Sequence, residues 1–403
     1  MDINTNHQAL KGLKILDIST MLAAPWVSTY LADFGADVIK VEHPEYGDHS
    51  RKYGKKKNDI PIFWKTLNRN KKGITLNLSQ PEGQELLKKM VAKVDVIIEN
   101  FRPGTLEKWN IGWDVLSEIN PSLIMLRVTG FGQDGPYAKK GGFGTVAEAM
   151  SGFTSINGPK GGPPTLPGAA LADGVCSVFG ALAIMIALHE RSNDPNRKGQ
   201  FIDISLYEPL MRILEPQITA YDQLGIIPQP IGNSSLQTAP RNAYQTKDGT
   251  WVALSGSSQS IAANVFKAIG REELIEDERF CTNEKRLENV EELDKILAQW
   301  IGERELDLVI ETFTDAGAVI GPMYNMSQLF EDPHYNYRQS LVKVQDKDFG
   351  ELTVANVFAK FSKTPGKVKT TGPDKGQHND EIYKGFLSLS EAELKELQDK
   401  KII

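Results

Sequence analysis

A single carboxylate lies at the junction between a loop rich in glycine and proline and an apolar helix. The loop occupies residues 163–168, Asp173 follows shortly after it, and residues 175–188 carry no charge. A helix of this composition is buried on most sides. Asp173 could cap the helix, because aspartate accepts the first free N–H groups well. Alternatively, it could act as a nucleophile or acid–base group near the positive end of the helix dipole.

Composition excludes several other kinds of chemistry. The 403 residues are 24% charged and 40% hydrophobic, and the net charge of -6 argues against nucleic-acid binding. Cys176 and Cys281 have no metal spacing, and the six histidines form no paired ligand pattern. Ser-His-Asp chemistry has no G-x-S-x-G elbow. We therefore expect no metal site, no tightly bound cofactor and no nucleic-acid partner.

Two features of the chain bear on its location. The N-terminal stretch, residues 1–8, is polar and has no signal-peptide core. The uncharged run at 175–188 is too short to cross a bilayer and is typical of a core helix. We expect a cytoplasmic protein with no membrane association.

Strands that alternate with helices surround the candidate residue. Strand-like apolar runs occupy residues 13–18, 36–42, 73–78, 94–99, 122–128 and 199–206. Helical segments lie between them, including one at 81–92 with proline in its first turn. This alternation predicts an α/β fold, a doubly wound layer with a parallel sheet and right-handed crossovers.

The second half of the chain has a different character. A linker at 226–235 leads to a strand at 251–255 and to helices at 261–269, 291–302 and 306–316, which predict a small α+β domain. Short strands and polar helices follow residue 341. We predict the N-terminal part of a large domain at 1–225, a small domain at 226–325, and a linker and C-terminal part at 326–403 that returns to the large domain.

Two loop features concern ligand binding. A basic segment between the second and third strands contains Arg51, Lys52, Lys55, Lys56, Lys57, Arg69, Lys71 and Lys72. These cations either form a solvated surface or bind a phosphorylated ligand near the strand ends, where open α/β sheets bind ligands. The G-x-G-x-x-G pattern at 130–135 is followed by a loop instead of a helix, so we exclude a dinucleotide site there.

Several short motifs together resemble the class III coenzyme A transferases, the family of formyl-CoA:oxalate and crotonobetainyl-CoA:carnitine CoA-transferases. They lie at residues 10–17, 23–25, 31–42, 70–74, 96–104, 130–136 and 163–173. Their number and order make the resemblance specific over most of residues 10–210. It implies a Rossmann-like large domain, a small domain and an interlocked homodimer. The implied substrates are an acyl-CoA and small carboxylic acids, with coenzyme A as co-substrate.

The resemblance makes Asp173 the covalent nucleophile. Its carboxylate would attack an acyl-CoA thioester to give an acyl-aspartyl anhydride, and the CoA thiolate would return to give an aspartyl-CoA thioester. The acceptor acid would then take up the CoA. Acyl-CoA racemases of the same superfamily are the alternative, but they carry a histidine where this chain has Phe143. Phenylalanine cannot transfer a proton, so the alternative lacks its base.

The remaining site residues also follow from the resemblance. The expected CoA contacts are Met21, Leu22, Ala23, His43, Lys72, Asn100, Phe101, Arg102 and Lys108. Relatives often have arginine at the positions of His43 and Lys108, so here the phosphate contacts lack a bidentate fork. The expected substrate or oxyanion contacts are Gly142, Phe143, Glu148, Gly256 and Gln259. Each cation could instead be a surface residue, and Glu148 could instead cap a turn.

Overall fold

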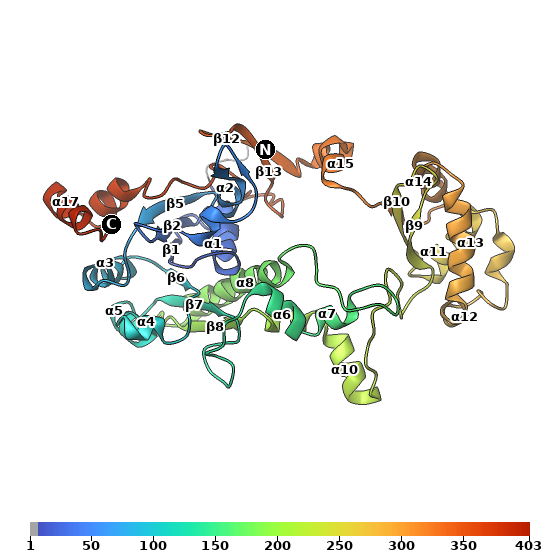
Figure 1. Ribbon diagram of the computed structural model, residues 1–403, viewed down its shortest axis with the longest axis horizontal. Helices are drawn as coiled ribbons and strands as arrows, with labels where there is room; N and C mark the ends of the chain where they lie inside the picture. Colours follow the sequence, from blue (N-terminus) through green and yellow to red (C-terminus); the bar gives the residue numbers. More distant parts are fainter. Residues whose placement is uncertain (1–6) are drawn as a thin grey trace. The chain divides into compact units, whose positions relative to one another are not determined.

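Alternating apolar runs of the first half of the chain form a sheet of six parallel strands. The computed structural model describes residues 7–403, so most of the polar N-terminal stretch lies outside the described residues. The strand order is β5-β2-β1-β6-β7-β8 (Figure 1). The bounds are β1 (Lys14–Asp17), β2 (Asp37–Glu42), β5 (Lys71–Thr75), β6 (Val96–Glu99), β7 (Ile124–Thr129) and β8 (Phe201–Ser205). The predicted parallel sheet is confirmed.

Both faces of this sheet are covered by helices, because successive strand residues point to opposite sides. Ile15 packs into a core with Val27 and Ile184, whereas its neighbour Leu16 packs into a core with Met90 and Leu394. The first core contains α1 (Ala23–Asp33) and α8 (Leu171–Asn193). The second contains α3 (Pro81–Val91), α5 (Trp113–Ile119), η3 (Glu381–Phe386) and α17 (Glu391–Asp399).

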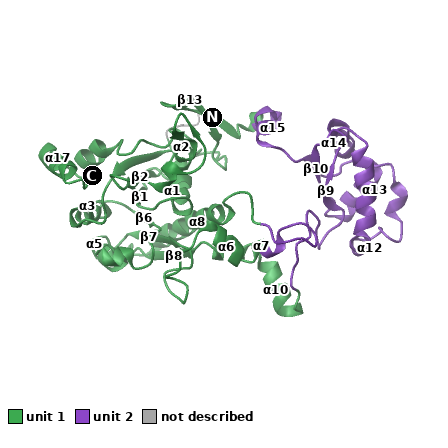
Figure 2. Ribbon diagram, viewed as in Figure 1, with its two compact units in different colours: residues 1–154, 166–226, 336–403 green, residues 155–165, 227–335 purple. Residues whose placement is uncertain are grey.

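The chain divides into two compact units (Figure 2). One contains the parallel sheet and comprises residues up to 154, 166–226 and 336–403; the other comprises residues 155–165 and 227–335. The second unit therefore differs from the predicted 226–325 in taking in an earlier segment. A hydrogen bond from the Gly232 N–H to the Gly158 carbonyl joins that segment to the linker.

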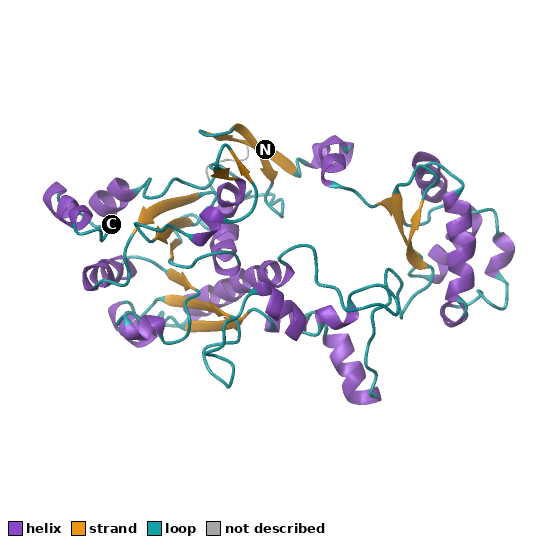
Figure 3. Cartoon of the chain, viewed as in Figure 1, coloured by secondary structure: helices purple, strands orange, loops and turns teal. Residues whose placement is uncertain are grey.

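Further elements complete each unit (Figure 3). Those of the first unit are η1 (His49–Lys52), β3 (Lys56–Lys57), β4 (Ile60–Pro61), α2 (Ile62–Leu67), α4 (Thr105–Lys108), α6 (Gly144–Met150), α9 (Glu208–Arg212), α10 (Glu215–Leu224), β12 (Leu341–Asp346) and β13 (Gly350–Ala355). Those of the second are β9 (Arg241–Gln245), β10 (Trp251–Ser255), β11 (Ile320–Pro322), α11 (Gln259–Ala268), η2 (Glu272–Ile275), α12 (Asn283–Glu288), α13 (Val290–Gly302), α14 (Leu306–Asp315) and α15 (Met326–Glu331). Two short helices, α7 (Phe153–Ile156) and α16 (Pro333–Arg338), span the unit boundaries.

The end of the chain covers the edge strand β5. His378 Nδ1 accepts from the Gly73 N–H at 3.1 Å, and Asn379 Oδ1 accepts from the Thr75 N–H at 2.9 Å. The buried Tyr383 hydroxyl donates to the Thr75 carbonyl at 2.6 Å. These bonds satisfy backbone groups that a sheet edge would otherwise expose. The predicted return of the tail thus supplies partners for β5.

The helix that begins near Asp173 is longer than expected, and one side of it is exposed. α8 has 23 residues, against 14 in the uncharged run, and is long and apolar enough to cross a membrane by length and composition alone. It packs on the sheet through Cys176 and Ile184. The stripe Val178, Leu182, Met185 and Ile186 is 39–61% exposed, so the expectation of burial on most sides is wrong.

Four charged side chains are buried together beneath the carboxyl ends of β1 and β2. Lys40 Nζ lies 3.1 Å from Asp48 Oδ2 and 3.7 Å from Asp17 Oδ1, and Lys71 Nζ lies 3.1 Å from Asp17 Oδ2. All four side chains are at most 3% exposed. Burial raises the pKa of Asp17, but the charges of Lys40 and Lys71 outweigh that effect and lower it to about 2. The pKa of Lys40 is raised and that of Asp48 lowered, whereas burial lowers the pKa of Lys71 to about 8, so the cluster is charged at neutral pH and Lys71 loses its proton above about pH 8.

Replacing Lys40 with methionine should destabilise the fold strongly. The variant fills the same space but leaves Asp17 and Asp48 buried without one of their cations. Removal of one partner from a buried ion pair typically costs about 3–5 kcal/mol. Denaturant titration would measure the free energy of unfolding, with Lys56→Met as an exposed lysine control. A loss below about 1 kcal/mol, within the usual range of surface substitutions, would contradict this account.

Candidate active site

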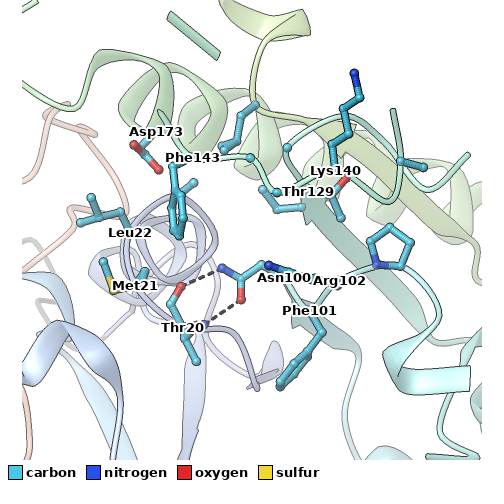
Figure 4. Close-up of a pocket in the computed structure, with 18 residues that line it drawn as sticks. Thr20, Met21, Leu22, Asn100, Phe101, Arg102, Thr129, Lys140, Phe143 and Asp173 are labelled. Atoms are coloured by element: carbon cyan, nitrogen blue, oxygen red, sulfur yellow. Dashed lines mark hydrogen bonds between the residues drawn. The ribbon is translucent and has the colours of Figure 1, made fainter. Parts of the chain in front are cut away.

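A pocket of about 240 Å³ opens at the carboxyl ends of β1, β6 and β7 (Figure 4). The chain leaves β1 towards one side of the sheet and β6 towards the other, so the pocket lies at the switch point where open α/β sheets bind ligands. Its walls are residues 20–23 after β1, 100–103 after β6, 128–129 at the end of β7, and Gly130, Ala138 and 140–143 after β7, together with Asp173 and Leu206.

The loop after β1 is held by side chains from two other loops. Asn100 accepts from the Thr20 N–H at 2.8 Å and donates to the Thr20 carbonyl at 2.7 Å (Figure 4). Asp48 Oδ1 accepts from the Met21 N–H at 3.2 Å, and Met21 has φ of 68°, in the left-handed region. A bulky residue adopts that conformation only where its surroundings impose it. The ion cluster therefore shapes the pocket wall through Asp48.

Asp173 lies in the first turn of α8 and does not cap the helix. The N-cap is Ala170, and Asp173 is the third helical residue, so the expectation of a capping role is wrong. Its carboxylate accepts a hydrogen bond from the N–H of Ala23, the first residue of α1. A Cβ added to Gly144 would lie 2.1 Å from Asp173 Oδ2, so only glycine fits beside the carboxylate.

Glu148 takes the capping role that was one of the two alternatives for Asp173. Glu148 Oε1 accepts from the N–H groups of Leu171 at 2.9 Å and Ala172 at 3.2 Å. The side chain is 4% exposed and is not among the residues that line the pocket. The structure therefore favours the capping alternative for Glu148 over direct contact with a substrate.

The environment of Asp173 favours its protonated form. Burial is the largest cause, the negative charge of Glu148 is the second, and together they raise the pKa of Asp173 from 3.8 to about 6. The hydrogen bond from Ala23 opposes them. The carboxylate is consequently more basic than an exposed aspartate and still mostly ionised at neutral pH.

The glycines near the pocket differ in how closely other backbone packs against them. Gly142 packs against Gly130, and a Cβ added to either would lie within 2.7 Å of the other's Cα. Gly174 has open space where a Cβ would project. Phe143 is 70% exposed beside Gly142 and lines the pocket. Gly142 is therefore required for backbone packing, whatever its part in catalysis.

Most predicted CoA contacts lie in or next to this pocket. Met21, Leu22, Ala23, Asn100, Phe101 and Arg102 line it. His43 lines a neighbouring pocket of about 220 Å³, which shares Thr20 and Phe101 with the first. His43 stacks on Tyr46 with 4.4 Å between ring centroids. The two pockets therefore adjoin along the carboxyl edge of the sheet.

Other predicted contacts lie elsewhere. Lys72 is in β5 and forms ion pairs of 3.0 Å with Asp37 and Glu381, and Lys108 is exposed at the end of α4. Neither lysine lines the pockets described above. Gly256 and Gln259 belong to the second unit, where Gln259 bonds with Cys281 and Arg286. Their predicted roles gain no support from the geometry.

The basic segment serves the fold more than a ligand. Arg51 binds both oxygens of Glu42 at 2.6 and 2.7 Å, and Arg69 binds both oxygens of Asp33 at 3.1 and 2.6 Å. Lys71 belongs to the ion cluster. These pairs correct the phosphate-binding interpretation for Arg51, Arg69 and Lys71, because their charges are already neutralised.

Sequence reasoning missed three pocket features. Gly144 contacts Asp173, Lys140 lines the pocket, and Asp48 holds Met21. The glycine-rich run around Phe143 was the available signal for Gly144. Among residues 7–403, no group of three or more His, Cys, Asp or Glu is arranged to hold a metal ion.

Comparisons with known proteins agree with this geometry. A family model described as CoA-transferase family III matches residues 10–379. A succinyl-CoA--D-citramalate CoA-transferase of Chloroflexus aurantiacus is 42% identical over 98% of each chain. A succinyl-CoA:glutarate CoA-transferase of Homo sapiens is 32% identical over 98% of this chain and 90% of its own length. The crystal structure of a CAIB/BAIF family protein from Brucella suis matches with a TM-score of 0.83 and 31% identity, over 96% of this chain and 100% of the other.

Replacing Asp173 with asparagine should stabilise the protein above pH 6. Because the pKa of Asp173 is about 6 when folded and 3.8 otherwise, the folded state binds more protons between these values, and stability falls as pH rises through them. Asparagine does not ionise and so avoids this loss. The free energy of unfolding of the variant should exceed that of the wild type by about 2 kcal/mol at pH 8, after allowance for partial exposure, and should equal it below pH 4.

Denaturant titrations of both proteins at pH 4, 6 and 8 would measure this difference. Asp114→Asn, on exposed α5, is the matched control and should show no such pH-dependent gain. An Asp173→Asn variant that is equally stable or less stable at pH 8 would contradict the raised pKa.

Proposed function

Because the chain belongs to CoA-transferase family III, we propose that Asp173 is the covalent nucleophile of its reaction. The protein is a CoA-transferase, which moves CoA from an acyl-CoA donor to a carboxylic acid acceptor. One observation carries the proposal. Asp173 is the only carboxylate among the residues that line the pocket at the switch point of the described sheet.

Each proposed step exchanges one acyl bond for another. An oxygen of Asp173 attacks the thioester carbonyl of the donor, and the CoA thiolate leaves, which gives an acyl-aspartyl anhydride. The thiolate then attacks the aspartyl carbonyl, and the donor carboxylate leaves. The acceptor carboxylate attacks the resulting aspartyl-CoA thioester, and the same steps in reverse yield acceptor-CoA and free Asp173. The free energy of the donor thioester is therefore retained in an activated acyl bond at every step.

The local environment of Asp173 supports this chemistry. A pKa of about 6 makes the carboxylate a stronger nucleophile than an exposed aspartate, while the Ala23 N–H helps to keep it ionised. The backbone around Gly141 and Gly142 lines the same pocket and offers N–H groups for the developing oxyanion. Phe143 would help to exclude water, which would otherwise hydrolyse the anhydride.

The adjoining pockets suggest how CoA lies along the sheet edge. The thioester would lie at Asp173, and the pantetheine arm would pass residues 20–23 and Asn100. The adenine would enter the neighbouring pocket between Phe101 and His43, where aromatic rings offer stacking surfaces. Arg102 is exposed beside Gly141 and is available for phosphate.

The acids are proposed to be dicarboxylic, with succinyl-CoA as a donor. The names of the Chloroflexus aurantiacus and Homo sapiens relatives specify succinyl-CoA with citramalate and glutarate. Arg102 and Lys140 line the pocket together with Asp173, and Lys140 Nζ lies 3.7 Å from the centroid of the Tyr137 ring without a carboxylate partner within residues 7–403. A cation at this position would compensate the second carboxylate of such an acid.

Replacing Asp173 with alanine should abolish CoA transfer while CoA still binds. The nucleophile is lost, and the pocket walls are unchanged. Transfer would be measured by chromatography of CoA esters, and binding by calorimetry. With acyl-CoA present, mass spectrometry of the wild-type peptide should show a modification on Asp173. Full transfer by the variant would contradict the role of Asp173 as nucleophile, and α-proton exchange in D2O without an acceptor would favour the racemase alternative.

A panel of acceptors should show a preference for dicarboxylates. With succinyl-CoA as donor, kcat/KM for glutarate, malate or citramalate should exceed that for butyrate by at least about tenfold, because the short monocarboxylate leaves a pocket cation unpaired. Lys140→Gln should reduce this ratio if Lys140 is that cation, and Lys139→Gln is the neighbouring control. Equal use of mono- and dicarboxylates would contradict the substrate proposal.

We also propose that the protein is a homodimer. The exposed apolar stripe of α8, and Ile218, Tyr221 and Leu224 on α10, at 48–71% exposure, form surfaces that soluble monomers rarely present to water. A second copy of the chain would bury such surfaces in a symmetric interface.

Replacing Leu182 with glutamate should therefore weaken the dimer. Light scattering coupled to gel filtration should give twice the 44.7 kDa of one chain for the wild type and a lower mass for the variant. The charge would be buried without a partner in the interface. Glu190→Gln, on the polar end of the same helix, is the control. A monomeric wild type would contradict the proposal.

A further inference from the structure

Glu148 and Asp173 are two carboxylates close together that have different surroundings. Glu148 belongs to α6 and Asp173 to α8, and both carboxylates lie at the start of α8, where helix N–H groups need acceptors. Glu148 receives the N–H groups of Leu171 and Ala172, while Asp173 receives those of Ala23 and of its own residue. The α8 N-terminus is thus shared between a buried residue and a residue that faces the pocket.

The short helix α6 fixes both carboxylates. It begins at Gly144, which contacts Asp173, and carries Glu148 one turn later. Ser151 and Thr154 donate hydrogen bonds to the Glu148 carbonyl at 3.0 and 2.9 Å, which anchors the end of α6. A shift of Glu148 would therefore move both the start of α8 and the backbone against Asp173.

We propose that Glu148 is a positioning residue that holds the start of α8 and sets the charge environment of Asp173 without touching substrate. Because Glu148 occupies the first two N–H groups of the helix, the Asp173 carboxylate does not fold back to cap them and stays directed at the pocket. The inference rests on the proposed role of Asp173 as nucleophile.

The charged groups around Asp173 leave Glu148 as the one that tunes it. Glu148 is the charge that acts on Asp173 from α6, whereas α1 contributes the neutral N–H of Ala23. Cys176, one turn along α8, has a raised pKa because it is buried near Asp173, so its thiol stays neutral. On α9, Glu208 accepts from Ser205 at 2.7 Å and acts on Cys176. Of these groups, Glu148 is therefore the one whose negative charge acts on Asp173.

Two substitutions separate the charge of Glu148 from its hydrogen bonds. Glu148→Gln keeps an oxygen for both N–H groups and removes the charge. The acidic limb of the pH profile of kcat/KM should move down by roughly 0.5–1 pH unit, so that the ratio of the rate at pH 5 to the rate at pH 8 rises about three- to fivefold. KM for the acyl-CoA should be unchanged. Glu148→Ala also removes the acceptor, and kcat at pH 8 should fall about tenfold or more.

A titration that needs no turnover distinguishes this inference from the proposed function. Carbon NMR of protein labelled at aspartate carboxyl carbons, assigned with Asp173→Asn, should show the same downward shift of the Asp173 midpoint in Glu148→Gln. The shift is expected even if Asp173 proves not to be the nucleophile. Glu190→Gln, on the same helix, should leave the midpoint in place.

Either of two results would overturn the inference. One is an Asp173 midpoint in Glu148→Gln equal to that of the wild type. The other is a raised KM for acyl-CoA in Glu148→Gln with kcat unchanged, which would mean that Glu148 contacts the substrate. If Glu148→Ala fails to fold, Glu148→Gln alone decides between these outcomes.

Discussion

The buried attraction between Lys40 and its two aspartates is the interaction on which the pocket depends. Asp17 ends β1, Lys40 lies in β2, and Asp48 follows β2, so the cluster joins two strands and a loop under one end of the sheet. Asp48 then imposes an unfavourable backbone conformation on Met21, and α1 begins two residues later. The N–H that meets Asp173 is therefore positioned by charges that are themselves buried beneath the pocket wall.

The site combines a stabilised wall with a destabilised reactive group. The loop after β1 is fixed by hydrogen bonds to Asn100 and Asp48, whereas Asp173 is held partly buried beside another carboxylate and a bare glycine backbone. Such an arrangement lowers the stability of the resting protein and raises the basicity of the Asp173 carboxylate. The acyl intermediate would be neutral, so its formation would relieve the repulsion from Glu148.

Local sequence patterns predicted the secondary-structure elements, because these depend on residues that are neighbours in the sequence. Short apolar runs in β1, β2 and β7 located the strands, and Pro81 located the start of α3. Pairings across the chain left no local signal: Glu148 caps a helix 23 residues later, and Lys72 pairs with Glu381. The phosphate-binding interpretation of the basic segment failed for the same reason, because the acidic partners of Arg69 and Lys71 lie far from them in sequence. The pocket residues came mainly from family resemblance, because spacing alone does not reveal which loops meet.

The seal on β5 has a consequence for biosynthesis. The residues that cover this edge strand, His378, Asn379 and Tyr383, are made some 300 positions after the strand itself. While the ribosome is still translating the second unit, the nascent sheet has an open edge that can pair with another chain. Slow translation through residues 227–335 would lengthen this exposure, so the yield of soluble enzyme should depend on chaperones that shield the edge until the tail emerges.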